Sequence, residues 1–225
     1  MAMVQNLSDA EHDIVTAAVR TAELATDGEI VTIVAGQSDD YADIAWAISG
    51  LVALTALAML TAFPDFYLAL WHRITGGWTG VTALPVWLFF VVTALKFLGT
   101  RLILLWRPLL YFITPPPIKH SRVRLRAIDL FRVGAERRTM GLTGILIYVS
   151  MAEHRAEIVA DEAITSKVAP EVWGDAMVAL ITELKLGRAG HGMAAAVGHV
   201  GAVLAQHLPK SGANPNELPD RLIEL

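Results

Sequence analysis

Two pairs of acidic residues stand at predicted strand ends, where loops commonly form binding sites. Asp39 and Asp40 follow the apolar run Glu29–Ala35, and Asp161 and Glu162 close the third β-rich run, AEIVAD. Loops at the carboxyl edge of parallel strands often bind ligands, and carboxylates hold hard cations. Asp39 and Asp40 are therefore candidate ligand or partner residues, and Asp161 and Glu162 are candidate ligands of calcium or another divalent cation.

Each pair also has a structural interpretation. Asp39 and Asp40 could simply keep a membrane-proximal turn solvated, and Asp161 with Glu162 could cap the following turn. A third candidate is the charged turn MAEHR, in which Glu153, His154 and Arg155 could bind a partner or form a solvated hairpin tip. The chain lacks a phosphate-binding glycine loop, a nucleophile elbow and a basic patch interleaved with aromatic residues, so we expect no nucleic-acid partner.

The elements that position these residues can be read from hydrophobic spacing. Glu29–Ala35 is apolar on both faces and rich in β-branched residues, as in an interior strand. The runs GILIYVS and AEIVAD, separated by MAEHR, predict an antiparallel pair. Before them, Ser8 and Glu11 form a capping box that begins a helix, and Gly28 is placed after its end as the C′ glycine.

Three further helices are predicted after residue 114. Residues 121–138 carry one apolar face; the next helix opens at Pro170 and ends before Gly187; the last is closed by Pro209. The buried stripe of the second of these contains the following residues: Trp173, Met177, Leu180, Ile181 and Leu184.

Membrane segments explain why 54% of the residues are hydrophobic and why the mean hydropathy is +0.49. Ile44 to Phe63 is long enough to span a bilayer, and a second span covers about 83–103. A short external loop with glycines joins them. Residues 101–113 are either the emerging end of the second span or an interfacial segment, and Lys96 is expected to snorkel to the inner boundary.

Charge and core closure both predict two spans with cytosolic termini. Lys119 to Arg138 carries seven Lys/Arg, whereas the loop between the spans carries only Arg73. The first strand needs the later strands as neighbours, so both flanks must share one compartment, and a parallel pair with an inserted hairpin is expected. Residues 1–43 carry nine acids and one Arg, so they attract the basic helix, which could alternatively face anionic lipid.

The domain organisation follows from these elements. Residues 1–43 and 114–209 form the two halves of one α/β domain with a small mixed sheet flanked by helices, 44–113 form a transmembrane hairpin, and 210–225 form a polar tail. We expect a multi-pass protein of the bacterial inner membrane, whose partners are the lipid bilayer and an unidentified membrane protein. A homo-oligomer is also possible.

Three stretches resemble the bacterial membrane branch of the TPM-domain family, also called the TPM phosphatase family or domain of unknown function 477. They are LSDAEHDIVTAAVRTAELATDGEIVTIVAGQSDDY, GLTGILIYVSMAEHRAEIVADEAI and NELPDRLIEL. The resemblance implies an α/β domain interrupted by a transmembrane hairpin, and no established reaction for this branch. Soluble members commonly carry Asp-Asn-Gly where this chain has Leu142, Thr143 and Gly144.

These observations favour a membrane-anchored binding or assembly module at the cytosolic face. The alternative is a divalent-cation-dependent phosphatase that uses Asp161 and Glu162, an activity implied by the family resemblance alone. No cofactor is required by the first interpretation. A transporter is disfavoured, since two spans with one Lys offer no polar pathway.

Overall fold

The computed structural model describes residues 7–76, 82–134, 143–211 and 218–225. These form two compact units: Met1–Asp39 with Pro115–Leu225, here called the α/β unit, and Asp40–Thr114, here called the hairpin unit. Some positions named in the sequence predictions lie outside the described residues: Gly77, Trp78 and Gly80 of the external loop, Leu142, and the predicted end of the basic helix.

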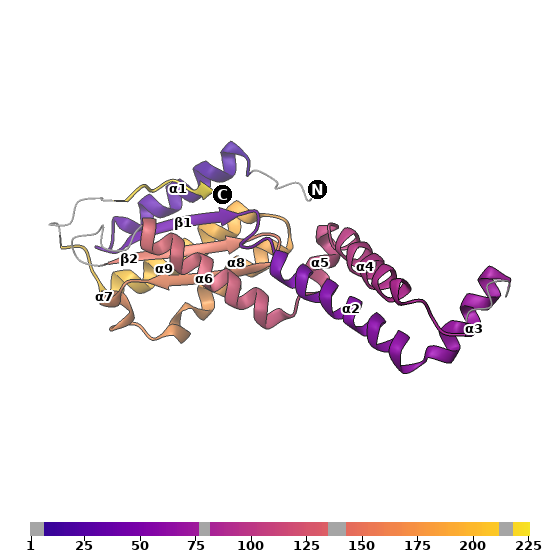
Figure 1. Ribbon diagram of the computed structural model, residues 1–225. Helices are drawn as coiled ribbons and strands as arrows, with labels where there is room; N and C mark the ends of the chain where they lie inside the picture. The colour runs from indigo at the N-terminus through magenta and orange to yellow at the C-terminus, as the bar shows by residue number, and fades with distance from the viewer. Residues whose placement is uncertain (1–6, 77–81, 135–142, 212–217) are drawn as a thin grey trace. The chain divides into compact units, whose positions relative to one another are not determined.

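A four-stranded mixed sheet forms the centre of the α/β unit (Figure 1). Strand β1 (Glu29–Ala35) pairs in parallel with β2 (Gly144–Ser150), with Glu29 opposite Gly144 and Ala35 opposite Ser150. Strand β3 (Arg155–Ala160) runs antiparallel to β2. The predicted parallel pair, interrupted by the hairpin segment, and the predicted antiparallel hairpin are thus confirmed.

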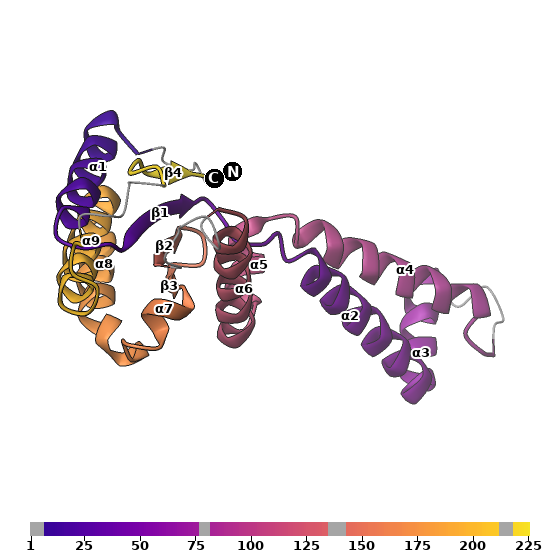
Figure 2. The same ribbon diagram turned by 90° about the vertical axis from the view of Figure 1, so that its left-hand side faces the viewer.

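Helices cover both faces of this sheet (Figure 2). Three helices cover one face: α1 (Asp9–Glu23), α8 (Gly174–Lys185) and α9 (Ala189–His207). They pack on Ile30, Val34 and the odd-numbered residues of β2. On the other face, α6 (Pro116–Gly134) packs through Val123, Ala127 and Phe131. Because successive strand residues face opposite sides, two buried faces require apolar residues at nearly every position. This explains the continuous apolar runs of β1 and β2.

Helix α1 begins as predicted and ends earlier than predicted. Ser8 and Glu11 make both hydrogen bonds of the capping box. The helix ends at Glu23 with Leu24 as its C-cap, so the prediction that Gly28 is the C′ glycine was wrong. Gly28 is instead buried, and a Cβ there would lie 2.9 Å from a methyl group of Leu204. The glycine allows close approach of α9 to the start of β1.

The chain's last residues add a strand that the sequence did not predict. Strand β4 (Ile223–Glu224) pairs in parallel with β1, giving the order β3-β2-β1-β4. The amide of Leu225 donates to the carbonyl of Val34 at 3.0 Å, and Gly36 donates back to Leu225 at 2.8 Å. Leu218 and Leu222 are buried. Residues 218–225 are therefore part of the α/β unit, and the prediction of a polar tail over 210–225 was wrong for them.

The segment between β3 and α9 is helical in three short steps. It contains α7 (Glu162–Thr165), the 3-10 turn η1 (Pro170–Trp173) and α8, after which Gly187 adopts a φ of +74°. Leu180 is fully buried at the centre of the packed face of α8. Ile181 is rotated from it by about 100° and is 40% exposed, so its assignment to the buried stripe was wrong.

The hairpin unit contains the two apolar helices, α2 (Ala42–Ala62) and α4 (Val86–Ile103), side by side. Their best 18-residue windows have mean hydropathies of 2.0 and 1.7, and α4 buries none of its window, so both are long and apolar enough to cross a membrane. The prediction of a short loop between them was wrong, because the connecting segment contains the helix α3 (Pro64–Thr75). After α4, α5 (Arg107–Ile113) is a separate short helix.

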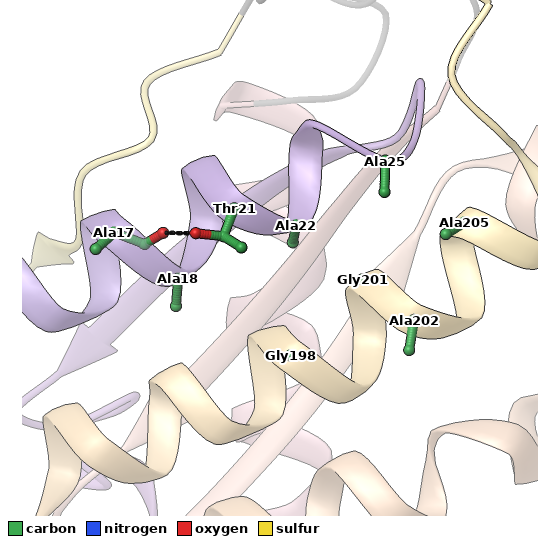
Figure 3. Close-up of a pocket in the computed structure, with 9 residues that line it drawn as sticks. All are labelled: Ala17, Ala18, Thr21, Ala22, Ala25, Gly198, Gly201, Ala202 and Ala205. Carbon is green, nitrogen blue, oxygen red and sulfur yellow. Dashed lines mark hydrogen bonds between the residues drawn. The ribbon is translucent and has the colours of Figure 1, made fainter.

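Close packing of α1 against α9 depends on small residues. Gly201 lies against Ala22, and a Cβ on Gly201 would be 2.5 Å from the Cβ of Ala22. Beside this contact lies a groove with a volume of about 450 Å³. It is lined by alanine, glycine and threonine residues, among them Gly198 (Figure 3). A Cβ on Gly198 would meet no atom within 4 Å. The two glycines therefore differ in what a methyl group would touch.

We predict that Gly201→Ala destabilises the α/β unit by about 1–3 kcal/mol, because the added methyl group overpacks a tight helix contact. Gly198→Ala is the matched control and is expected to be neutral or stabilising by up to about 1 kcal/mol, since alanine favours a helix over glycine. Denaturant unfolding of the purified full chain measures both. Equal stabilities of the two variants would contradict the packing described here.

Candidate functional site: the base of the inserted hairpin

The carboxylate of Glu153 organises the loop that follows β1. It accepts hydrogen bonds from the backbone amide of Ser38, at 3.1 and 3.3 Å, and from the hydroxyl of Ser150. Glu153 is only 6% exposed, so the interpretation of its turn as a solvated tip does not hold for this residue. His154, with a φ of +52°, is exposed, and Arg155 is half-buried. The turn therefore fixes the end of β1.

A buried tyrosine fixes the same loop from the sheet. The hydroxyl of Tyr148 lies 2.9 Å from the hydroxyl of Ser38, and the Tyr148 side chain is fully buried on the α6 face. Burial raises the pKa of Tyr148, with the nearby Glu153 carboxylate acting in the same direction. The phenol therefore stays neutral and available for hydrogen bonding. Ser38 is thus held through both its amide and its side chain.

An ion pair joins the two chain segments that connect the α/β unit to the hairpin. Asp39 is the last residue of the α/β unit before the insertion, and its carboxylate lies 3.2 Å from the guanidinium of Arg122. Arg122 lies on α6, which begins one residue after the chain returns at Pro115. The outgoing and returning segments are therefore side by side within the α/β unit. This pair realises the predicted attraction between the acidic N-terminal part and the basic helix.

The hairpin unit ties its own two ends together in the same way. Arg107 of α5 donates a hydrogen bond of 2.7 Å to the carbonyl of Asp40. Tyr41 is fully buried, and its ring packs edge-on against that of Tyr111 with centroids 5.6 Å apart. Asp40 also accepts from the amide of Ala42 through its carboxylate at 3.0 Å. Asp39 thus contacts α6 within the α/β unit, and Asp40 contacts α5 within the hairpin unit.

The other acidic pair, Asp161 and Glu162, lies at the opposite end of the sheet, beside the start of β2. The Asp161 carboxylate accepts from the amide of Gly144 at 3.0 Å, and the amide of Asp161 donates to the carbonyl of Gly144 at 2.9 Å. Its side chain makes no capping bond to α7, and Glu162 is exposed. Within the described ranges, no three His, Asp or Glu side chains are grouped so that they could hold a metal ion. A cation role for this pair remains a prediction.

The acidic residues buried near the start of β1 were not predicted from the sequence. Glu23 is 8% exposed; one carboxylate oxygen accepts from the amide of Ile30 at 2.9 Å, and the other has no hydrogen-bond partner among the described residues. Burial, followed by repulsion from Glu29 and Asp220, raises the pKa of Glu23 to about 7. The spacing of Glu23 from the buried Val15 and Val19 was the available signal, since all three lie on one helix face.

We predict that the stability of the chain falls as the pH rises from about 4.5 to about 7, through Glu23. Its folded pKa lies above its ordinary value of 4.5, so the folded state holds the proton more tightly, and deprotonation favours unfolding. A shift from 4.5 to about 7 corresponds to about 3 kcal/mol at pH 8. Glu23→Gln should therefore be more stable than the wild-type chain at pH 8 and similar at pH 4.5, in denaturant unfolding.

The matched control is Glu162→Gln, which changes an exposed carboxylate and should leave the pH dependence unchanged. Parallel stability curves of Glu23→Gln and the wild-type chain between pH 5 and 8 would show that Glu23 titrates normally.

Among known proteins, the chain has a match in fold. No protein-family model matches the chain, and no curated protein matches it. Among solved structures, it is similar to the NMR structure of BA42 protein from the psychrophilic bacteria Bizionia argentinensis sp. nov., with a TM-score of 0.57 and 17% identity over the whole of both chains. At this identity the likeness shows a shared α/β fold.

Proposed function

We propose that this protein is a membrane-anchored binding module of the bacterial inner membrane. Helices α2 and α4 cross the bilayer, and the α/β unit lies on the cytosolic side with both termini. There it binds a membrane-protein partner. The parallel pairing of β1 with β2 supports an even number of spans, because strands on either side of the insertion belong to one sheet.

The exposed surface of the hairpin unit supports the membrane assignment. Large apolar side chains point outward from both helices: Leu51, Leu54, Phe90, Leu95 and Leu98 are each more than half exposed. In water such a surface would be unfavourable, and in lipid it is the expected one. Aromatic residues mark both ends: Trp46 contacts Phe97, with Arg101 over the Trp46 ring, and Trp71 packs against Trp87.

The observation that carries the proposal is the double attachment at the base of the hairpin. Asp39 and Arg122 hold the two connecting segments together in the α/β unit, and Arg107 holds the same two segments in the hairpin unit. A domain attached at two adjacent points loses less freedom on binding a partner than one on a single flexible linker. Such an attachment suits a module that presents a surface to a neighbour in the same membrane.

The partner surface that we favour lies on α8. Val178 is 65% exposed and Ile181, one turn further on, is 40% exposed; Leu186 follows the helix and is also exposed. Neighbouring exposed apolar residues on a helix are typical of a protein interface. The sequence resemblance to the membrane branch of the TPM-domain family supports the proposed architecture, an α/β domain interrupted by a transmembrane hairpin.

A cysteine-labelling experiment tests the topology, and the chain itself contains no cysteine. Asp13→Cys and Ser166→Cys, both exposed in the α/β unit, should react with a membrane-impermeant maleimide only after the inner membrane of spheroplasts is opened. Thr82→Cys, exposed between α3 and α4, should react in intact spheroplasts. Reaction of Asp13→Cys and Ser166→Cys from opposite sides would exclude the proposal.

Photocrosslinking in native membranes tests the binding role. A photoreactive amino acid at Val178 should give a discrete crosslink to another membrane protein, whereas the same amino acid at Ser166, the exposed C-cap residue of α7 in the same unit, should not. Replacing Ile181 with Glu should remove the Val178 crosslink, because a charge would interrupt the apolar surface. Only lipid adducts and adducts to the same chain at Val178 would overturn the assignment.

A further inference from the structure

A groove with a cation at one end lies between the two apolar helices of the hairpin unit. It has a volume of about 520 Å³ and is lined mainly by apolar residues of α2, from Leu51 to Leu60, with Tyr67, Val92 and Lys96. Residues 51 and 60 are separated by nine helical positions, which correspond to about 13 Å along the axis. The groove is therefore long, narrow and apolar, and it contains one charged side chain.

Contacts between the helices show where Lys96 lies along the groove. Trp46, near the start of α2, contacts Phe97 of α4 with ring centroids 5.7 Å apart. Lys96 precedes Phe97, so it lies at the Leu51 end, toward the point where the chain enters and leaves the hairpin unit. Tyr67 follows α2 in the chain and lies at the Leu60 end.

Lys96 is within reach of a lipid headgroup. Arg101 lies over the ring of Trp46 at 5.0 Å and marks the interfacial level, and Lys96 precedes it by five positions, or about 7 Å of helix. A lysine stem can extend along apolar surface and place its ammonium group at the interface. Lys96 is exposed and makes no hydrogen bond or ion pair with any described residue.

We propose that this groove binds one anionic phospholipid of the cytosolic leaflet, which rests on the membrane topology proposed above. The headgroup phosphate pairs with the Lys96 ammonium, and an acyl chain lies in the groove along Val52, Ala56 and Leu60. A phosphate already lies at the interface, whereas an acidic side chain of a partner helix would have to be buried in the bilayer at additional cost. A second copy offers no such acid, because residues 44–63 and 83–113 contain neither Asp nor Glu.

Native mass spectrometry of the purified full chain tests the site, with phosphatidylglycerol and phosphatidylcholine of identical acyl chains as probes. The wild-type chain should retain phosphatidylglycerol about fivefold better, the preference expected for one lysine near an anionic headgroup. Lys96→Gln should bring the two lipids to parity, and Lys96→Arg should keep the preference. Lys185→Gln, which removes an exposed charge from α8, is the matched control and should keep it as well.

A second variant tests the acyl-chain part of the site. Ala56→Phe fills the groove and should weaken retention of both lipids, with little effect on the ratio between them. An unchanged preference in Lys96→Gln, or unchanged retention in Ala56→Phe, would overturn the lipid site. Alkaline extraction of membranes separates the two proposals: release of the wild-type chain would refute the membrane anchor, whereas retention of the chain without lipid selectivity would refute only the lipid site.

Discussion

The parallel pairing of β1 with β2 is the constraint on which the rest of the structure depends. Seven successive residues, from Glu29 to Ala35, match Gly144 to Ser150, and the segment between the strands contains the entire hairpin unit. Because parallel strands need a crossover, α6 returns over one face of the sheet, and α1, α8 and α9 cover the other. The hairpin can be inserted without disturbing this core because its two ends leave and re-enter the α/β unit next to each other.

At the two ends of the sheet, buried side chains accept hydrogen bonds from backbone amides that the strands leave unpaired. At one end, Glu153 satisfies Ser38 and Ser150, and Tyr148 reaches the same loop from the sheet. At the other end, the Asp161 carboxylate accepts a hydrogen bond from the amide of Gly144, and the Glu23 carboxylate accepts one from the amide of Ile30. Buried donors need acceptors. These side chains therefore have a sufficient structural role, and the proposed function rests on the double attachment and on the exposed surfaces.

The sequence predicted those parts of the fold that follow from local periodicity. β1 was recognised because both of its faces are apolar, and β2 because a β-rich run precedes the charged turn MAEHR. The start of α1 was recognised because Ser8 and Glu11 cap it within one turn. It did not predict β4, since only Ile223 and Glu224 pair and their partner lies almost 200 residues earlier. The pairing of Asp39 with Arg122 was visible only as opposite net charges, and the burial of Glu153 depends on a loop that reaches it from residue 38. Helix α3 was obscured by its polar residues, such as Asp65 and Arg73, which resemble a loop.

The strand order has a consequence for biosynthesis. Both neighbours of β1 are translated much later than β1 itself: β2 begins at Gly144, and β4 begins at Ile223. Until then, the nascent chain carries a β-branched segment with two unpaired edges. Such edges are prone to aggregate. The sheet is therefore completed only after Ile223 and Glu224 have been translated, and a chain truncated before them would leave β1 without its β4 partner.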